Sequence, residues 1–246
     1  GIITSNNNVV VIANIYGSGS TAQQLYSYNA YKAGAKKWYM PSLVKNYYGW
    51  NASIIPQNIS DKTAHIKVKF STGYSKSYTL NPYSSTTIYI PHLPLPSGMK
   101  GLFAATITSD VDIVVMVNQS NKYNRASTYN AFSEGSTKVF APGVMKRASI
   151  FSTSVTCQNV GEGPTRMKLE YSNAPNAGST SPMIQVGDIH LWYQPISSLP
   201  NGYDGSAVIT SLDNQNIACI INRNTEDEPY FSKSWDMYFA VNGINQ

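Results

Sequence analysis

Side chains that commonly carry catalysis are few and widely scattered in this sequence. The three histidines, His65, His92 and His190, lie far apart, and no two of them have the spacing of a zinc-binding pair. The sequence contains no nucleophile elbow, no phosphate-binding loop and no dinucleotide-binding glycine motif. Residues 1–109 contain one acid, Asp61, so this half has no carboxylate pair for glycoside hydrolysis. These features predict a protein that is not an enzyme and that uses no metal or other cofactor.

Two groups of residues could serve other kinds of chemistry. Cys157 and Cys219 lie in strand-like runs, where a secreted protein would join them in a disulfide; two buried free thiols are the alternative. Tyr47, Tyr48 and Trp50 could form a platform that contacts a sugar or a surface, because aromatic faces with a polar edge suit that task. Packing at a strand end is the alternative for these aromatic residues.

Three asparagines lie in N-glycosylation sequons, namely Asn51, Asn58 and Asn118. Chance supplies several sequons in a chain this rich in Asn, Ser and Thr. Asn118 also has two counterparts that lie outside sequons, Asn14 and Asn222, and each of the three follows a similar apolar run. We therefore expect the repeated role of these asparagines to be closing a turn with the side-chain amide.

The elements that must position these residues are organised as an internal repeat. Residues 28–59 align with residues 129–160 without a gap, at an offset of 101 positions. The sequence "LPSG" at residues 95–98 also returns as "LPNG" at residues 199–202, and both favour a turn. The repeat predicts two domains, a first repeat at residues 28–128 and a second repeat at residues 129–246. Residues 1–27 precede them as an N-terminal strand and a flexible linker.

Both repeats have the periodicity of β-strands. Segments such as "HIKVKF" and "RMKLEY" alternate apolar and polar residues, and clusters of Gly, Pro, Asn or Ser separate such segments. Charged residues make up 13% of the chain, which also contains 18 tyrosines, and this composition is typical of an extracellular β-protein. We expect an all-β fold with two tandem immunoglobulin-like antiparallel β-sandwiches and an extra N-terminal β-strand.

One strand-like segment occurs three times, whereas the rest of the repeat occurs twice. Its copies are "VVVIA", "IVVMV" and "IACII", each followed by an Asn, and these asparagines are spaced 104 residues apart. Runs that are apolar at every position predict strands that are covered on both sides. The N-terminal copy is the surplus one if the strand ends each repeat, and the copy after Thr210 is the surplus one if the strand begins each repeat. In either case an unpaired apolar strand must pair with something. The predicted assembly strand consists of Val9, Val10, Val11, Ile12, Ala13, Asn14 and Ile15.

These motifs together resemble a tandem β-sandwich repeat of secreted and cell-surface proteins of filamentous bacteria. The resemblance lies in the "YNA" motif before an aromatic residue, in "YYGWNASIIPQN", in "LPSG" and in "TSDVDIVVMVNQ". It spans nearly the whole chain, although the second repeat has "ASIF" in place of "YYGW". The resemblance implies an extracellular or cell-surface location and a modular architecture. The surplus strand resembles the donor strand of pili, which is added to the sheet of a neighbouring subunit.

The charge distribution suggests how such modules could associate. Residues 1–109 carry a net charge of +8 without any Arg, and residues 110–246 carry a net charge of −3. The absence of Arg in the basic half argues against a nucleic-acid partner, and no apolar run is long enough to span a membrane. A head-to-tail contact between copies of the chain explains both signs. We therefore expect a structural subunit of a filament, pilus or surface layer; an adhesin or carbohydrate-binding fragment that contacts cell-surface glycans is the alternative.

Overall fold

The protein has an all-β fold, as expected from its periodicity. The computed structural model describes residues 2–16, 25–95, 101–121, 125–225 and 239–246. The first nine strands are β1 (Ile12–Tyr16), β2 (Leu25–Asn29), β3 (Ala35–Lys45), β4 (Trp50–Asn58), β5 (Ala64–Phe70), β6 (Ser75–Leu80), β7 (Ile88–Tyr89), β8 (Gly101–Asn121) and β9 (Ala126–Asn130). The last nine are β10 (Lys138–Lys146), β11 (Phe151–Asn159), β12 (Met167–Tyr171), β13 (Ala174–Thr180), β14 (Ile189–Tyr193), β15 (Tyr203–Ser211), β16 (Ile217–Thr225), β17 (Phe239–Asn242) and β18 (Ile244–Asn245). Two 3-10 turns, Ile90–His92 and Gln194–Ile196, complete the described elements.

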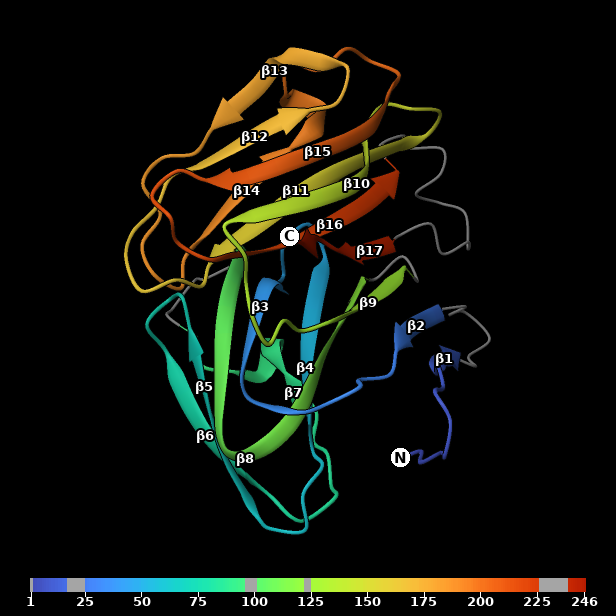
Figure 1. Cartoon of the computed structure of the whole chain (residues 1–246), viewed down its shortest axis with the longest axis vertical. Helices are drawn as coiled ribbons and strands as arrows, with labels where there is room; N and C mark the ends of the chain where they lie inside the picture. The colour runs from blue at the N-terminus through green and yellow to red at the C-terminus, as the bar shows by residue number, and fades with distance from the viewer. Residues whose placement is uncertain (1, 17–24, 96–100, 122–124, 226–238) are drawn as a thin grey trace.

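The first repeat is built around the long strand β8. The part of β8 before Ile113 pairs with β3 and β5, whereas the part after it pairs with β4 and β9, all antiparallel. Figure 1 shows β8 curving between these two groups of strands. The main apolar core lies between the groups, with Ile54, Ile66, Ile107 and Val117 among its fully buried members. The sheet includes β9, so its β-structure runs past the boundary predicted at residue 128.

The second repeat uses two strands where the first uses one. A five-stranded sheet has the order β13-β12-β15-β10-β18, and a four-stranded sheet has the order β14-β11-β16-β17. The strands β15 and β16 correspond to the two parts of β8, and a short turn separates them. A second core lies between the sheets and includes Val139, Val155, Leu169 and Ile209. The architecture is therefore β-sandwich-like in both repeats (Figure 1).

The two repeats also agree in strand register. The pairing of Ile54 with Val117 in the first repeat corresponds to the pairing of Val155 with Ile221 in the second. A β-bulge interrupts β3 just after Met40, and a bulge interrupts β10 at the equivalent Ala141. Such agreement follows from the sequence repeat, because apolar residues at the same alternate positions must face a core in both copies.

The expectation that the repeated apolar strand is covered on both sides holds only in the second repeat. Ala218 and Ile220 of β16 are buried along with their neighbours in the strand, whereas Val114 and Met116 at the same positions of β8 are partly exposed. The cause is tertiary, because β3 of the first repeat packs on the outer face of β11 and β16. No helix in the described part of the chain is long and apolar enough to cross a membrane.

Candidate functional site: terminal hairpins and the junction between repeats

The N-terminal strand β1 forms a hairpin with β2 that is separate from the larger sheets. Two other hairpins, β8–β9 and β16–β17, end the two repeats. All three hairpins share one register, in which the repeated Asn lies opposite Ser27, Thr128 or Ala240. In each hairpin the backbone N–H of the residue after the second strand also donates to the first strand: Ala30 to Val11, Ala131 to Val115 and Gly243 to Cys219. The surplus strand is therefore part of a third copy of a complete terminal hairpin.

These hairpins are stacked on one another through a repeated hydrogen bond. The side-chain amide of Asn130 donates to the backbone oxygen of Asn29 over 2.7 Å. The side-chain amide of Asn242 donates to the backbone oxygen of Asn130, again over 2.7 Å. Figure 1 shows β2, β9 and β17 in this order along one side of the molecule. The N-terminal hairpin thus contacts the first repeat in the way that the hairpin of the first repeat contacts the second.

The N-terminal hairpin differs from the other two in what covers it. The second edge of the β8 segment is paired with β4, and the second edge of β16 is paired with β11. In the described residues, β1 pairs only with β2. Val9 of this segment is 56% exposed, whereas its counterparts Ile113 and Ile217 are completely buried. The hairpin therefore has an open strand edge and an apolar face without a core.

The repeated asparagines lie within strands, so the expectation that they close turns is wrong. Asn14, Asn118 and Asn222 each pair across the strand ladder inside their hairpin. The side-chain amide of Asn222 donates to Ser42 Oγ over 3.2 Å and so links the two repeats. A repeated Asn in the sequence does not show whether the residue lies in a turn or on the face of a strand that contacts a neighbouring unit.

Ser42 is the centre of a polar cluster at the junction between repeats. Its backbone oxygen accepts hydrogen bonds from the Tyr129 hydroxyl over 2.7 Å and from Gln119 Nε2 over 2.8 Å. Arg125 Nη1 donates to Asn224 Oδ1 over 3.1 Å and forms a further link to the second repeat. These side chains are buried or nearly so, and hydrogen bonds in such surroundings fix the orientation of the units that they join. No sequence motif identified this cluster.

The three aromatic residues predicted as a contact platform have different environments. Trp50 is 9% exposed and belongs to the core of the first repeat, which agrees with the packing alternative for this residue. Tyr48 is 83% exposed, and its ring meets the edge of Tyr47 with 4.8 Å between ring centroids. All three line a cleft of about 680 Å³ between the repeats. Tyr48 is thus the member of the group that is presented to solvent.

The sequon at Asn58 cannot carry a glycan in the folded protein. Asn58 is fully buried, and its Nδ2, the atom to which a glycan would be attached, donates to the backbone oxygens of Lys62 and Asn81. Asn159 holds the equivalent loop of the second repeat in the same way, which explains why both repeats keep an Asn here. Asn51 and Asn118 are only partly buried. The local sequence does not distinguish a buried Asn that holds a loop from an exposed Asn in a sequon.

Cys157 and Cys219 are joined by a disulfide, which is the first of the two states considered from the sequence. The two residues lie directly opposite each other on β11 and β16, and both are completely buried. Pro56 and Val115 are opposite each other at the same place in the first repeat. The disulfide therefore joins β16 covalently to β11 in the second repeat. At the same position of the first repeat, the strands are held by packing and backbone hydrogen bonds without a covalent link.

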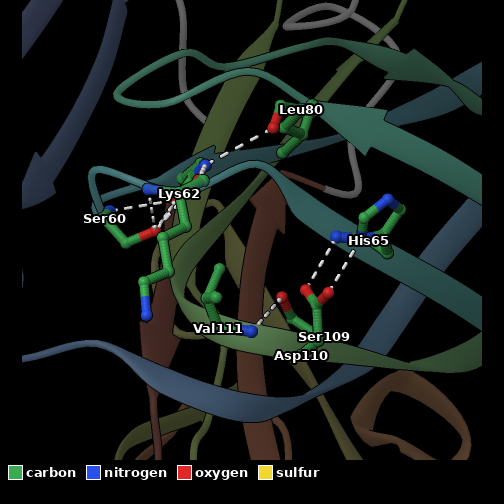
Figure 2. A network of polar contacts seen from close by, with 8 residues as sticks. Ser60, Lys62, His65, Leu80, Ser109, Asp110 and Val111 are labelled. Carbon is green, nitrogen blue, oxygen red and sulfur yellow. Dashed lines mark hydrogen bonds and ion pairs between the residues drawn. The ribbon is translucent and has the colours of Figure 1, made fainter.

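The acidic residue of the "TSD" motif ties two strands together (Figure 2). Asp110 accepts a hydrogen bond from the backbone N–H of His65 over 2.8 Å, and its other oxygen lies 2.8 Å from His65 Nδ1. Asp213 accepts from the backbone N–H of Arg166 over 2.8 Å at the equivalent place. These backbone hydrogen bonds, with the neighbouring side chains, lower the pKa of both carboxyl groups. Within the described residues, no group of His, Cys, Asp or Glu is arranged to hold a metal ion.

Replacing Asp110 and Asp213 together by Asn is expected to flatten the acid limb of the stability profile. Because each carboxyl has a lower pKa when folded, its contribution is fully present above the unfolded pKa of about 3.9 and is lost as the pH falls through the folded pKa. Urea unfolding between neutral and strongly acidic pH measures this effect. The substitution Asp61→Asn, at an exposed acid of another loop, is the control. An acid limb as steep in the double variant as in the parent would contradict the assignment.

Charged residues of both signs line one hollow at the junction between the repeats. A hollow of about 560 Å³ is lined by Lys37, Lys67 and Lys69 of the first repeat and by Asp188 of the second. Burial raises the pKa of Asp188 above its ordinary value. Basic residues of the first half and an acid of the second half therefore line one hollow within a single molecule.

Comparisons with known proteins add little to this geometry. No family model matches the sequence. No curated protein matches it at a significant level. A solved structure described as the crystal structure of Thermotoga maritima 1070 is similar at 23% identity and a TM-score of 0.36, over 41% of this chain and 96% of that one. A similarity of this size carries no argument about function, so the candidate site rests on the residues described above.

Proposed function

We propose that this chain is a structural module of an extracellular filament, pilus or surface layer in which β-sandwich repeats are joined head to tail. The units of this assembly are two tandem immunoglobulin-like sandwiches, close to residues 28–128 and 129–246. The joint between units is the interface that the two repeats of this chain already form. The N-terminal hairpin extends the array by β-strand addition to a preceding repeat that lacks a terminal hairpin of its own.

The observation that carries this proposal is the repeated hydrogen bond between successive hairpins. Asn242 contacts Asn130 as Asn130 contacts Asn29, so the same hydrogen bond links three successive hairpins. In a heterologous contact, one end of a unit binds the opposite end of the next unit. Such a contact can be repeated without limit and can build fibres or layers. The disulfide supports an extracellular location, because oxidising compartments preserve such bonds.

The outer face of the first repeat supports the same step. Ile55 and Met116 are only partly buried on this face, whereas Thr156 and Ile220 at the equivalent positions of the second repeat are completely buried. The strand β3 covers the second face, and the equivalent strand of a preceding unit would cover the first. The outer face of the first repeat is thus available for the contact that already buries the outer face of the second repeat.

Removing the N-terminal hairpin is expected to open this contact to a second copy of the chain. In the full chain, the hairpin already occupies the place next to Asn130 that the terminal hairpin of another molecule would take. A shortened chain that begins at Tyr31 frees that place, so its second repeat can dock on the first repeat of the next molecule. Sedimentation velocity and electron microscopy should show head-to-tail oligomers of the shortened chain and monomers of the full chain at the same concentration.

The substitution Met116→Lys in the shortened chain provides the control for this experiment. Met116 lies on the outer face and is partly exposed, so a lysine there leaves the core intact but places a charge in the contact. We expect this variant to remain monomeric with an unchanged circular dichroism spectrum. A shortened chain that is folded but monomeric would contradict head-to-tail assembly.

A further inference from the structure

The cleft between the two repeats has the form of a binding site. It encloses about 680 Å³, which is within the usual size range of small-ligand pockets. One wall comes from the turn between β3 and β4, with Tyr47 and Tyr48, and the other comes from the end of β14 and the following turn, with Tyr193 and Ile196. The floor is formed by β11 and β16. A ligand in this cleft would contact both repeats at once.

The floor of the cleft carries buried polar atoms that lack partners. Thr156 Oγ1, Asn222 Oδ1 and Thr225 Oγ1 are buried and have no hydrogen-bond partner among the described residues. All three residues line the cleft, and each is at most 8% exposed. Buried polar atoms are normally satisfied, because leaving them unpaired costs free energy. The floor of the cleft is therefore polar, and Ser154, which also lines it, is a hydroxyl-bearing residue that is partly exposed.

The rim of the cleft is apolar and aromatic. Tyr48 is 83% exposed, Ile196 is 83% exposed and Tyr193 is 47% exposed, so each presents a large surface to whatever enters. Tyr48 and Tyr193 belong to different repeats, and both line the cleft. Aromatic side chains of this kind suit a ligand that has apolar faces together with polar edges.

The part of the lining that the structure describes carries little charge. Among the described lining residues there is no carboxylate, and the one cation is Arg147. Arg147 donates through Nη1 to Asn201 Oδ1 over 3.2 Å, so its charge is already held by a neighbouring loop. Binding of nucleic acid or an acidic polymer normally requires several cations in the site.

We propose that the cleft between the repeats binds a neutral saccharide, with its hydroxyl groups on the polar floor and its apolar ring faces against Tyr48 and Tyr193. A sugar matches both features, because each ring carries hydroxyl groups at its edge and C–H groups on its faces. The site adds recognition of glycans to a structural module, and it does not depend on how the module assembles.

The test uses the full chain and neutral oligosaccharides of defined composition. Hexasaccharides of β-1,4-glucose, α-1,4-glucose, mannose and N-acetylglucosamine are added separately at millimolar concentration, and saturation-transfer NMR detects binding. We expect at least one of them to bind, with a dissociation constant that is unchanged by added salt, since no ion pair is involved. Absence of transfer to all four, or binding only of a charged polymer such as alginate or heparin, would overturn the proposal.

Two variants then locate the binding in the cleft. Tyr48→Asn removes the exposed ring but tolerates the left-handed backbone at this residue, where φ is 48°. Ser154→Ala removes a hydroxyl group from a floor residue that is partly exposed. We expect affinity to fall about tenfold for Tyr48→Asn and about fivefold for Ser154→Ala.

Tyr83→Asn is the matched control for these variants. Tyr83 is also an exposed tyrosine with a left-handed backbone, at φ 54°, and it does not line the cleft. Its replacement should leave saccharide affinity unchanged. Equal affinities of the Tyr48, Ser154 and Tyr83 variants, each shown to be folded by circular dichroism, would place the saccharide elsewhere and refute the assignment.

Discussion

A chain that carries a second copy of residues 31–111 in frame before Asn8 is expected to fold into three β-sandwich units. Residue 111 precedes the segment that ends the first repeat, and Asn8 begins the equivalent segment of the N-terminal hairpin. The added copy supplies every strand of a repeat except its terminal hairpin. The hairpin β1–β2 has the register needed to supply that part.

The added unit is stabilised by burying apolar side chains that are exposed or partly exposed in the parent chain. In the first repeat, the counterparts of Val9 and Val11 are completely buried, and the free edge of β1 corresponds to an edge that is paired with β4. Burying the two valines contributes roughly 3–6 kcal/mol before the entropy of ordering is subtracted. Neither complete repeat of this chain can accept the hairpin, because β8 and β16 already fill the position and the disulfide locks β16 in place.

Hydrogen exchange of the β1 amides gives the clearest readout of the extended chain. These amides should exchange slowly in the extended chain and rapidly in the parent, and the added segment should resist proteolysis. Val11→Asp in the extended chain places a charge in the new core and should abolish both effects. The same substitution in the parent chain should have little effect on stability, since Val11 is not fully buried there. An added segment that stays unprotected, although both original repeats fold, would disprove strand addition by the hairpin.

Replacement of Cys157 and Cys219 by Ala and Val is expected to destabilise the second repeat by about 4 kcal/mol. The bridge joins residues 62 positions apart, and in the chain-entropy model a closed loop of this size restricts the unfolded state by that amount. For a unit of about a hundred residues this change lowers the melting temperature by roughly 20 °C. Both sulfurs lie in the apolar core, so the apolar replacements avoid a buried polar group.

Scanning calorimetry of the double variant can assign the loss to one repeat. The transition of the second repeat should move to lower temperature, and that of the first repeat should move less, because the first repeat has Pro56 and Val115 at the same place. Treatment of the parent with a reductant under mildly denaturing conditions should reproduce the shift. A double variant with the melting profile of the parent would show that the bridge does not restrict the unfolded chain.

Much of the fold could be predicted from residues that are close in the sequence. The alternation in "HIKVKF" becomes β5, in which every second residue is buried. The offset of 101 residues also predicts the shared register of the two repeats, since equal patterns must turn equal residues toward a core. The candidate site was predicted less well: Trp50 lies in the core, Asn58 is buried and the repeated asparagines lie in strands.

The sequence by itself determined the strand type, the repeat and the existence of a third hairpin strand, because these depend on local alternation and on self-similarity. Only the tertiary structure decided which faces are covered. Thr156 and Ile220 are completely buried because β3 of another repeat lies over them, whereas the equivalent Ile55 and Met116 are not. The burial of a strand's outer face depends on contacts between residues more than a hundred positions apart, and such contacts leave no periodic trace in either strand.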